Sequence, residues 1–347
     1  MSVAAFHGAN LARVRHTPHA MLATSTHDSK RSEDVRARLN VLSEMPDEWA
    51  VALGRWQTMN RALAERIDAR VDPQDEYLLY QTLVGIWPFE PPDQAALDGL
   101  RERVQAYMLK ALREAKCHTS WVNPNLEHEG DLARFIDRLL GAIEPNPFLK
   151  DLQAFVTPVA QQGGANSLNQ LLLKMTVPGV PDIYQGCESW QFNLVDPDNR
   201  RPVDFPAMQA LLDDVQAAYA GGALDTTAAR QWLQAPARGH IKMAVTWRLL
   251  TLRQAQARLF ERGAYRPLDP TGDVAERVVA FIRQDDEARD IRCIVLATRL
   301  GLGADPALWG EGSVSWPALP DEHLDVQGEP AWHDALTGHR LPPQQRG

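Results

Sequence analysis

The sequence predicts an α/β chain with a long helical stretch in its middle and an all-β part towards its C-terminal end. Two short apolar runs, residues 20–28 and 177–188, each become polar at their end, as a buried parallel strand does where it delivers side chains to a loop. From the first run to about residue 150, apolar residues recur with helical spacing. After about residue 240, Gly, Pro and Trp separate short strand-like segments.

The helical stretch has clear starts and stops. Ser32 is a favoured N-cap, and Glu33 and Asp34 suit the positive end of a helix dipole, so a helix is expected directly after Ser32. The strongest amphipathic pattern covers residues 131–141, where apolar residues recur at i, i+3, i+4, i+7 and i+8. Gly141 is a candidate C-cap for that helix.

Further segments complete the outline. The prolines of residues 88–92 predict a loop. Residues 168–175 predict another helix, directly before the second apolar run. The segment around Phe281 and residues 292–298 are rich in the apolar residues that strands favour. These strands place the expected β part at the end of the chain.

Composition narrows the classes of function. The chain has 347 residues, 44% of them hydrophobic and 23% charged, which is typical of a globular protein. A net charge of −9 argues against a nucleic-acid partner, because phosphate binding needs a basic surface. No apolar stretch approaches the ~20 residues of a membrane helix, and no leader pattern opens the sequence, so we expect a cytoplasmic protein with no membrane partner. Cys117, Cys187 and Cys293 form no CxxC pair, which argues against a disulfide framework or zinc knuckle.

Polar residues follow each apolar run. His27 and Asp28 end the first run, and Tyr184 and Glu188 end the second. A His-Asp pair alone is weak evidence for a site. Its position matters more, because barrel enzymes keep catalytic groups at the C-terminal ends of buried strands. The histidines show no metal-ligand spacing, so we expect no metal site and no cofactor.

Two other features leave alternatives open. The run of residues 196–204, which includes Asp198 and Arg200, is either a solvated loop held by local Asp–Arg pairs or a loop that binds hydroxyls and orients carboxylates. Trp87, Trp121 and Trp190 lie in or beside expected loops. Each either stacks on a sugar ring or belongs to the core or a lid.

Taken together, these segments resemble the maltooligosyltrehalose synthase family. Five motifs occur in that family's order, at residues 21–38, 77–83, 116–125, 178–188 and 194–205, with a looser match at residues 332–338. The family belongs to the α-amylase superfamily, whose fold is a (β/α)8 barrel followed by a β-domain. The resemblance implies barrel strands seven and eight with a helical insertion between them and a β-sandwich-like domain after them. The implied divisions are residues 1–31 (strand seven), 32–150 (insertion), 151–238 (strand eight and following helix) and 239–347 (β-domain).

The resemblance also implies an activity. The family is a glucosylmutase, an isomerase of trehalose biosynthesis that converts the reducing-end α-1,4 bond of a maltooligosaccharide into an α,α-1,1 bond. By resemblance, Asp28 is a catalytic carboxylate, His27 is its neighbour in the −1 subsite, and Lys30 lies at the acceptor side. The maltooligosaccharide substrate is the implied partner. The implied substrate-binding residues are His27, Lys30, Arg31, Tyr184, Asp198 and Arg200.

The resemblance is incomplete. Retaining chemistry needs a nucleophile and a general acid, and neither has a matching position here, because strands one to six have no counterpart. We therefore expect an inactive fragment, with an N-terminal barrel half as a candidate partner. Alternatives are a non-catalytic glucan-binding or structural module and an α-glucan hydrolase of the same superfamily, although the runs at residues 26–31 and 196–204 argue against the hydrolase. A metal-dependent phosphohydrolase using His27 and Asp28 is a remote third.

Overall fold

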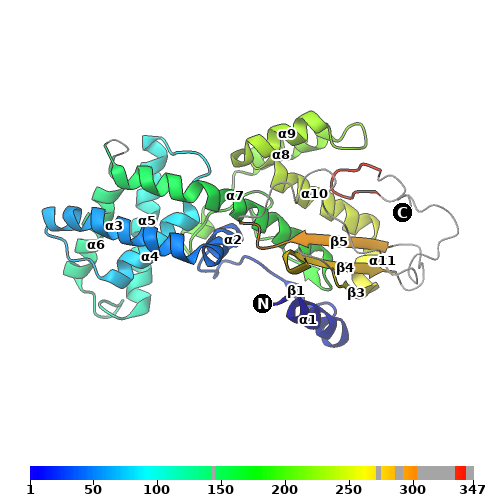
Figure 1. Ribbon diagram of the computed structural model, residues 1–347, viewed down its shortest axis with the longest axis horizontal. Helices are drawn as coiled ribbons and strands as arrows, with labels where there is room; N and C mark the ends of the chain where they lie inside the picture. Colours follow the sequence, from blue (N-terminus) through cyan, green and yellow to red (C-terminus); the bar gives the residue numbers. More distant parts are fainter. Residues whose placement is uncertain (143–144, 271–274, 286–291, 303–332, 341–347) are drawn as a thin grey trace. The chain divides into compact units, whose positions relative to one another are not determined.

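The computed structural model describes residues 1–142, 145–270, 275–285, 292–302 and 333–340. Most of these residues are helical, and two small sheets accompany the helices (Figure 1). The chain divides into two compact units. Unit 1 comprises residues 1–24, 166–190 and 203–347, and unit 2 comprises residues 25–165 and 191–202. The long helix α7 (Pro147–Thr176) contributes to both units.

The two apolar runs of the sequence form a parallel pair in unit 1. Strand β1 (Met21–Leu22) lies beside β2 (Val180–Pro181), with Met21 opposite Val180. Helix α1 (Val3–His16) precedes β1, and the Ser2 hydroxyl caps it by accepting a hydrogen bond from the amide of Ala5. Each strand is two residues long, so most of each apolar run is loop rather than strand.

An antiparallel sheet also belongs to unit 1. Strands β3 (Ala264–Leu268), β4 (Val278–Gln284) and β5 (Arg292–Thr298) lie in that order, with β4 in the middle. Phe281 on β4 is fully buried. The strands expected near Phe281 and over residues 292–298 are therefore confirmed.

Two helices precede this sheet, where strand-like segments were expected from about residue 239. They are α10 (His240–Ala255) and α11 (Ala257–Arg262). Residues 240–262 contain neither Gly nor Pro, and Met243, Thr246 and Leu249 are buried along one face of α10 at helical spacing. Helices α8 (Phe205–Ala218) and α9 (Thr226–Gln234) pack with α10 around a small core of their own.

Unit 2 is helical. Its helices are α2 (Glu33–Val41), α3 (Pro46–Arg66), α4 (Pro73–Ile86), α5 (Gln94–Ala115), α6 (Leu126–Leu139) and the first part of α7. Ser32 stands at the N-cap of α2, as expected. The pattern over residues 131–141 is confirmed, because Leu132, Phe135 and Ile136 are buried on α6. The C-cap of that helix is Leu140 rather than Gly141.

An aromatic cluster forms the core of unit 2. The Trp56 ring lies edge-on to Tyr80 and Phe148, at centroid distances of 5.4 and 5.7 Å. The polar atoms of the cluster have partners: Trp56 Nε1 donates to Asp151 at 2.6 Å, and the Tyr80 hydroxyl donates to Glu76 at 2.6 Å. A buried polar atom without a partner would destabilise the core, and here the aromatic rings avoid that cost.

A buried arginine on α2 contacts the loop that follows α4. Arg38 on α2 is 1% exposed and donates a hydrogen bond to the carbonyl of Trp87. Its guanidinium lies 3.7 Å from the ring centroid of Phe192 and 4.6 Å from that of Phe89. Burial lowers the pKa of Arg38 to about 9, although the nearby charge of Asp34 raises it.

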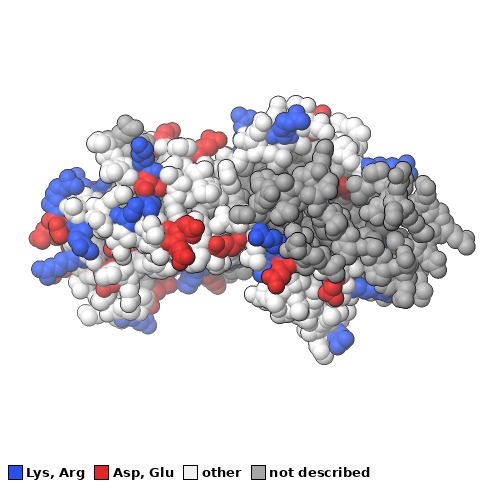
Figure 2. All heavy atoms as spheres, viewed as in Figure 1, with Lys and Arg blue, Asp and Glu red and all other residues white. Residues whose placement is uncertain are grey.

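The surface carries charges of both signs. On the face seen in Figure 2, basic and acidic side chains of the described residues are interspersed rather than separated into fields. Within the described ranges, no helix is both long enough and apolar enough to cross a membrane.

Gly163 tests the packing around Arg38. A methyl group at Gly163 would lie 2.8 Å from the Cα of Arg38, too close for α7 and α2 to keep their spacing. We expect Gly163→Ala to lower the free energy of unfolding by about 1 to 3 kcal/mol. Gly54→Ala on α3 is the matched control, because its added methyl meets nothing within 4 Å and should stabilise the helix by up to about 1 kcal/mol. Equal urea midpoints for the two variants would contradict this packing.

Candidate functional site

The loop that carries His27 and Asp28 begins and ends at fixed points of unit 2. The Ser25 hydroxyl accepts a hydrogen bond from the amide of Glu33 at 2.9 Å, which ties the start of the loop to α2. The Ser32 hydroxyl does not cap its own helix. It donates instead to the carbonyl of Gln191, while the Ser32 amide donates to the carbonyl of Asn193 at 2.9 Å. The segment of residues 25–32 therefore has little freedom to move.

A tight turn inside this loop presents the His-Asp pair. The Thr26 amide donates to the Ser29 hydroxyl at 2.9 Å, and the Asp28 amide donates to the Thr26 hydroxyl at 3.2 Å. His27 Nε2 lies 3.2 Å from Asp28 Oδ2, and the side chains of His27 and Asp28 are 59% and 81% exposed. Ser32, not Asp28, is the N-cap of α2, so the Asp28 carboxylate projects from a held turn without capping a helix.

The run of residues 196–204 supports the turn from the other side. Its short 3₁₀ helix η2 (Asp198–Arg200) places the Asn199 amide group against the loop. Asn199 Nδ2 donates to the carbonyl of His27 at 2.8 Å and to that of Thr26 at 3.3 Å. The two segments that the sequence singled out are thus brought together within unit 2 by hydrogen bonds from the Asn199 side chain to backbone carbonyls.

Asp198 is the anchor of that support. It is 7% exposed and accepts two hydrogen bonds from Arg103, at 2.8 and 2.9 Å, and one from the amide of Leu194 at 2.8 Å. Arg201 forms a further ion pair with it at 3.0 Å. Burial raises the pKa of the Asp198 carboxyl, but the hydrogen bonds and charge of Arg103 outweigh burial and hold the pKa below its usual range. Asp198 is therefore an internal clamp, and its neighbour Arg200 stays half exposed beside Asp196, at 3.2 Å.

The two cations that end the loop point to different partners. Lys30 Nζ lies 3.1 Å from Glu114 on α5, and the Lys30 side chain is 68% exposed. Arg31 is drawn to α4, where it donates to Gln81 at 2.7 Å and to Thr82 at 3.2 Å. Lys30 therefore keeps an accessible ammonium, whereas Arg31 positions the loop.

Tyr184 belongs to unit 1, in the loop after β2, and is half-buried there. Of the other predicted site residues, His27, Asp28 and Lys30 lie on one exposed turn, and Arg31 and Asp198 hold that turn. Sequence reasoning missed Asn199 as a contact of the turn and Arg103 as the partner of Asp198. No sequence signal links Arg103 to this loop, because the pair is 95 residues apart.

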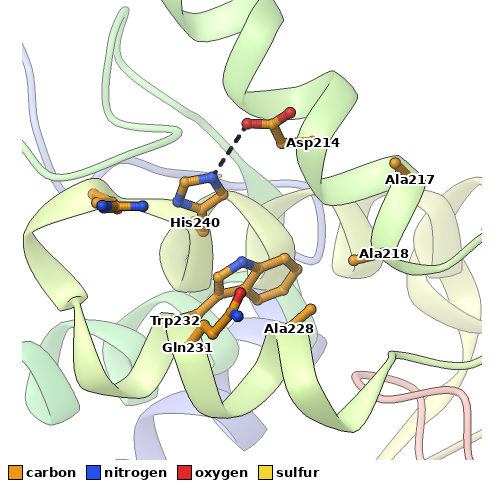
Figure 3. A pocket seen from close by; sticks show the side chains of 8 residues that line it. Asp214, Ala217, Ala218, Ala228, Gln231, Trp232 and His240 are labelled. Atoms are coloured by element: carbon orange, nitrogen blue, oxygen red, sulfur yellow. Dashed lines mark ion pairs between the residues drawn. The ribbon is translucent and has the colours of Figure 1, made fainter.

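Two cavities among the described residues lie away from the predicted site residues. One of about 330 Å³ is lined by side chains of α8–α10, where Trp232 stacks on His240 and Asp214 points at the same imidazole from 3.5 Å (Figure 3). Another of about 190 Å³ lies between α4 and the loop after α5. Neither cavity is lined by a predicted site residue. Within the part of the chain that the structure describes, no group of three or more His, Cys, Asp or Glu side chains is placed to hold a metal ion.

The Asp198 clamp makes a prediction about stability and pH. Asp198→Asn leaves Arg103 without its charged partner, and we expect a loss of about 3 kcal/mol in the free energy of unfolding at pH 7. Because the folded pKa of Asp198 is depressed, its contribution is complete above the unfolded pKa of about 4 and is lost as the pH falls through the folded value. Urea titrations between pH 7 and pH 2 should show the variant and wild type converging at low pH. Asp196→Asn, in an exposed pair of the same loop, should cost less than about 1 kcal/mol.

The chain is similar to known proteins both in sequence and in structure. No family model matches it. A curated protein of Mycobacterium tuberculosis, provisionally named a maltooligosyl trehalose synthase, is 36% identical over 338 residues, which cover 97% of this chain and 37% of that protein. The solved structure of maltooligosyltrehalose synthase from Arthrobacter ramosus matches with a TM-score of 0.73 and 33% identity, over 99% of this chain and 38% of that one. A Sulfolobus tokodaii structure, described as a hypothetical maltooligosyl trehalose synthase, matches with a TM-score of 0.67 and 34% identity, over 86% of this chain and 36% of that one.

Sequence and structure therefore agree on the relationship. The chain spans little more than a third of the length of the relatives it matches, 37% of the Mycobacterium tuberculosis protein and 38% of the Arthrobacter ramosus chain. The match nevertheless covers nearly the whole of this chain, at identities above 30%. The chain belongs to the maltooligosyltrehalose synthase family, and it corresponds to a C-terminal portion of its members.

Proposed function

We propose that this chain supplies the C-terminal portion of a maltooligosyltrehalose-forming active site, in which Asp28 is a catalytic carboxylate. The observation that carries the proposal is the geometry of Asp28. Its side chain is 81% exposed on a turn held by Asn199, Ser25 and Ser32. An exposed carboxylate on a loop that hydrogen bonds hold in place is what a binding or catalytic role requires.

In this proposal, Asp28 binds the hydroxyls of the sugar whose glycosidic bond is exchanged. A carboxylate accepts hydrogen bonds from two sugar hydroxyls and favours the positive charge that develops on an oxocarbenium-like centre. His27, 3.2 Å away, would bind the same sugar and orient the carboxylate. In this proposal β1 and β2 are strands seven and eight of a barrel. The nucleophile and general acid, which retaining chemistry needs about 5 to 5.5 Å apart, would come from barrel strands that have no counterpart in this chain.

Lys30 is proposed to hold the acceptor. Its ammonium is exposed at one end of the turn and is steadied by Glu114 at 3.1 Å. Forming an α,α-1,1 bond requires the released glucose to stay in the site, turn over and attack through its anomeric hydroxyl. An ammonium that donates to glucose hydroxyls would keep the sugar in place and disfavour attack by water.

The test of the proposal is a chimera in which this chain replaces the matching portion of the Arthrobacter ramosus enzyme, with the chain alone as the inactive baseline. We expect Asp28→Asn in the chimera to lower kcat about a thousandfold with little change in KM, because losing ~4 kcal/mol of transition-state stabilisation has that effect. Stability should change by less than about 0.5 kcal/mol, since the side chain is exposed. Product is followed as non-reducing sugar from maltopentaose, and near-normal turnover by the variant would refute the catalytic role.

Lys30→Ala in the same chimera separates transfer from hydrolysis. We expect the share of maltopentaose converted to free glucose to rise severalfold, because the acceptor escapes and water takes its place. Lys116→Ala provides the control, since Lys116 stands in the left-handed C-cap position of α5 and not on the turn. An unchanged ratio of glucose to non-reducing product in Lys30→Ala would remove Lys30 from the acceptor site.

A further inference from the structure

The structure separates the three tryptophans that the sequence left undecided. Trp87 is 1% exposed, and its Nε1 donates to Gln153 at 2.6 Å. Trp190 is half-buried, and its Nε1 donates to the carbonyl of Pro236 at 2.8 Å. Both are packing residues of their own units. Trp121 differs from them because 58% of it is exposed.

The exposed Trp121 ring is supported by a neighbouring side chain. It lies in the loop between α5 and α6, where the guanidinium carbon of Arg113 is 4.9 Å from the ring centroid. Arg113 is itself fixed by two hydrogen bonds to Glu129, at 2.8 and 2.7 Å, and Glu129 accepts another from Thr119 at 2.5 Å. The hydrogen bonds from Arg113 also lower the pKa of Glu129, so that this pair is charged at neutral pH. A cation held in this way supports one side of the indole.

The loop around the ring is closed by its own hydrogen bonds. The Ser120 amide donates to the carbonyl of Asn123 at 3.2 Å, and the Asn123 amide donates back to the Ser120 hydroxyl at 3.0 Å. The Asn125 amide donates to Thr119 at 2.9 Å, and the Asn125 side chain caps α6. Binding a ligand here would cost little ordering of the loop, because the loop is already ordered.

Two further exposed apolar residues follow Trp121 in the sequence. Val122 is 93% exposed, and Leu126, at the start of α6, is 72% exposed. Single exposed apolar residues are common and need no explanation. Three of them within six residues, one an aromatic ring backed by a fixed cation, distinguish this loop from scattered single cases.

The Trp121 loop and the turn that carries Asp28 both contact the last turn of α5. Lys30 pairs with Glu114, and the residue before Glu114 on α5 is Arg113, which supports the Trp121 ring. The last turn of α5 thus carries both the partner of Lys30 and the support of Trp121, all within unit 2.

We infer that Trp121 is a stacking platform for a glucosyl residue of an α-1,4-glucan, outside the pair of sugars that reacts. The choice of ligand class rests on the proposed function. A pyranose ring presents C–H groups on its faces and hydroxyls at its rim, so a flat, exposed aromatic ring fits it. Three exposed apolar residues are few against the roughly 20 to 30 residues that each side of a stable protein interface buries.

The test follows the indole of Trp121 directly in the ¹⁵N-labelled full chain. Its Nε1–H resonance is assigned as the one lost in Trp121→Phe, and maltoheptaose and glucose are then titrated separately. We expect the resonance to shift saturably with maltoheptaose and much less with glucose. Trp121→Ala should weaken maltoheptaose binding at least tenfold, and Trp121→Phe, which keeps an aromatic face, should stay within about threefold of wild type. Leu233→Ala on α9, another exposed apolar residue, should leave the affinity unchanged.

The outcomes distinguish this inference from the proposed function. An indole signal that does not move with maltoheptaose, or an affinity unchanged in Trp121→Ala, overturns the platform even if Asp28 proves catalytic. A saturable shift of the indole supports the platform even if Asp28→Asn leaves turnover intact. A change of sedimentation in Trp121→Ala without maltoheptaose binding would instead make this loop a protein interface and would also overturn the inference.

Discussion

The ion pair between Asp198 and Arg103 is the constraint on which the candidate site depends. Asp198 also accepts a hydrogen bond from the amide of Leu194, so a single buried carboxylate fixes the segment that leads into Asn199. Asn199 in turn holds the carbonyls of Thr26 and His27. The turn that presents Asp28 is therefore fixed through hydrogen bonds that start at a buried charge, and that charge is satisfied by a bidentate partner.

The polar groups of unit 2 divide between those that build the fold and those that remain available. Arg31 donates to Gln81 on α4, Arg38 lies against the ring of Phe192, and Asp198 pairs with Arg103 on α5. These contacts hold the loops of unit 2 together. Asp28 and Lys30 have surface partners only and stay largely exposed. This division is what a functional surface needs, because groups that meet a ligand must not already be committed to the core.

The comparison with relatives also shows how much of a complete enzyme this chain represents. Sequence and structural similarity covers nearly all of this chain but little more than a third of its relatives. A retaining mechanism needs two carboxyl groups in addition to one that binds the sugar. The turn at Asp28 presents an exposed carboxylate and the ammonium of Lys30, and the last turn of α5 contacts both Lys30 and the Trp121 ring.

The sequence by itself determined several local elements. The start of α2 after Ser32 follows from capping, the buried face of α6 from periodicity, and strands β4 and β5 from residues that favour strands, all of which act between neighbours in the chain. It also singled out Asp28 and the run of residues 196–204, through their resemblance to a family. Only the tertiary structure decided that Asp198 is a buried clamp, that helices occupy residues 240–262, and that Trp121 is exposed while Trp87 is not. Those outcomes depend on partners such as Arg103, 95 residues from Asp198, and burial is a property of packing that no local pattern contains.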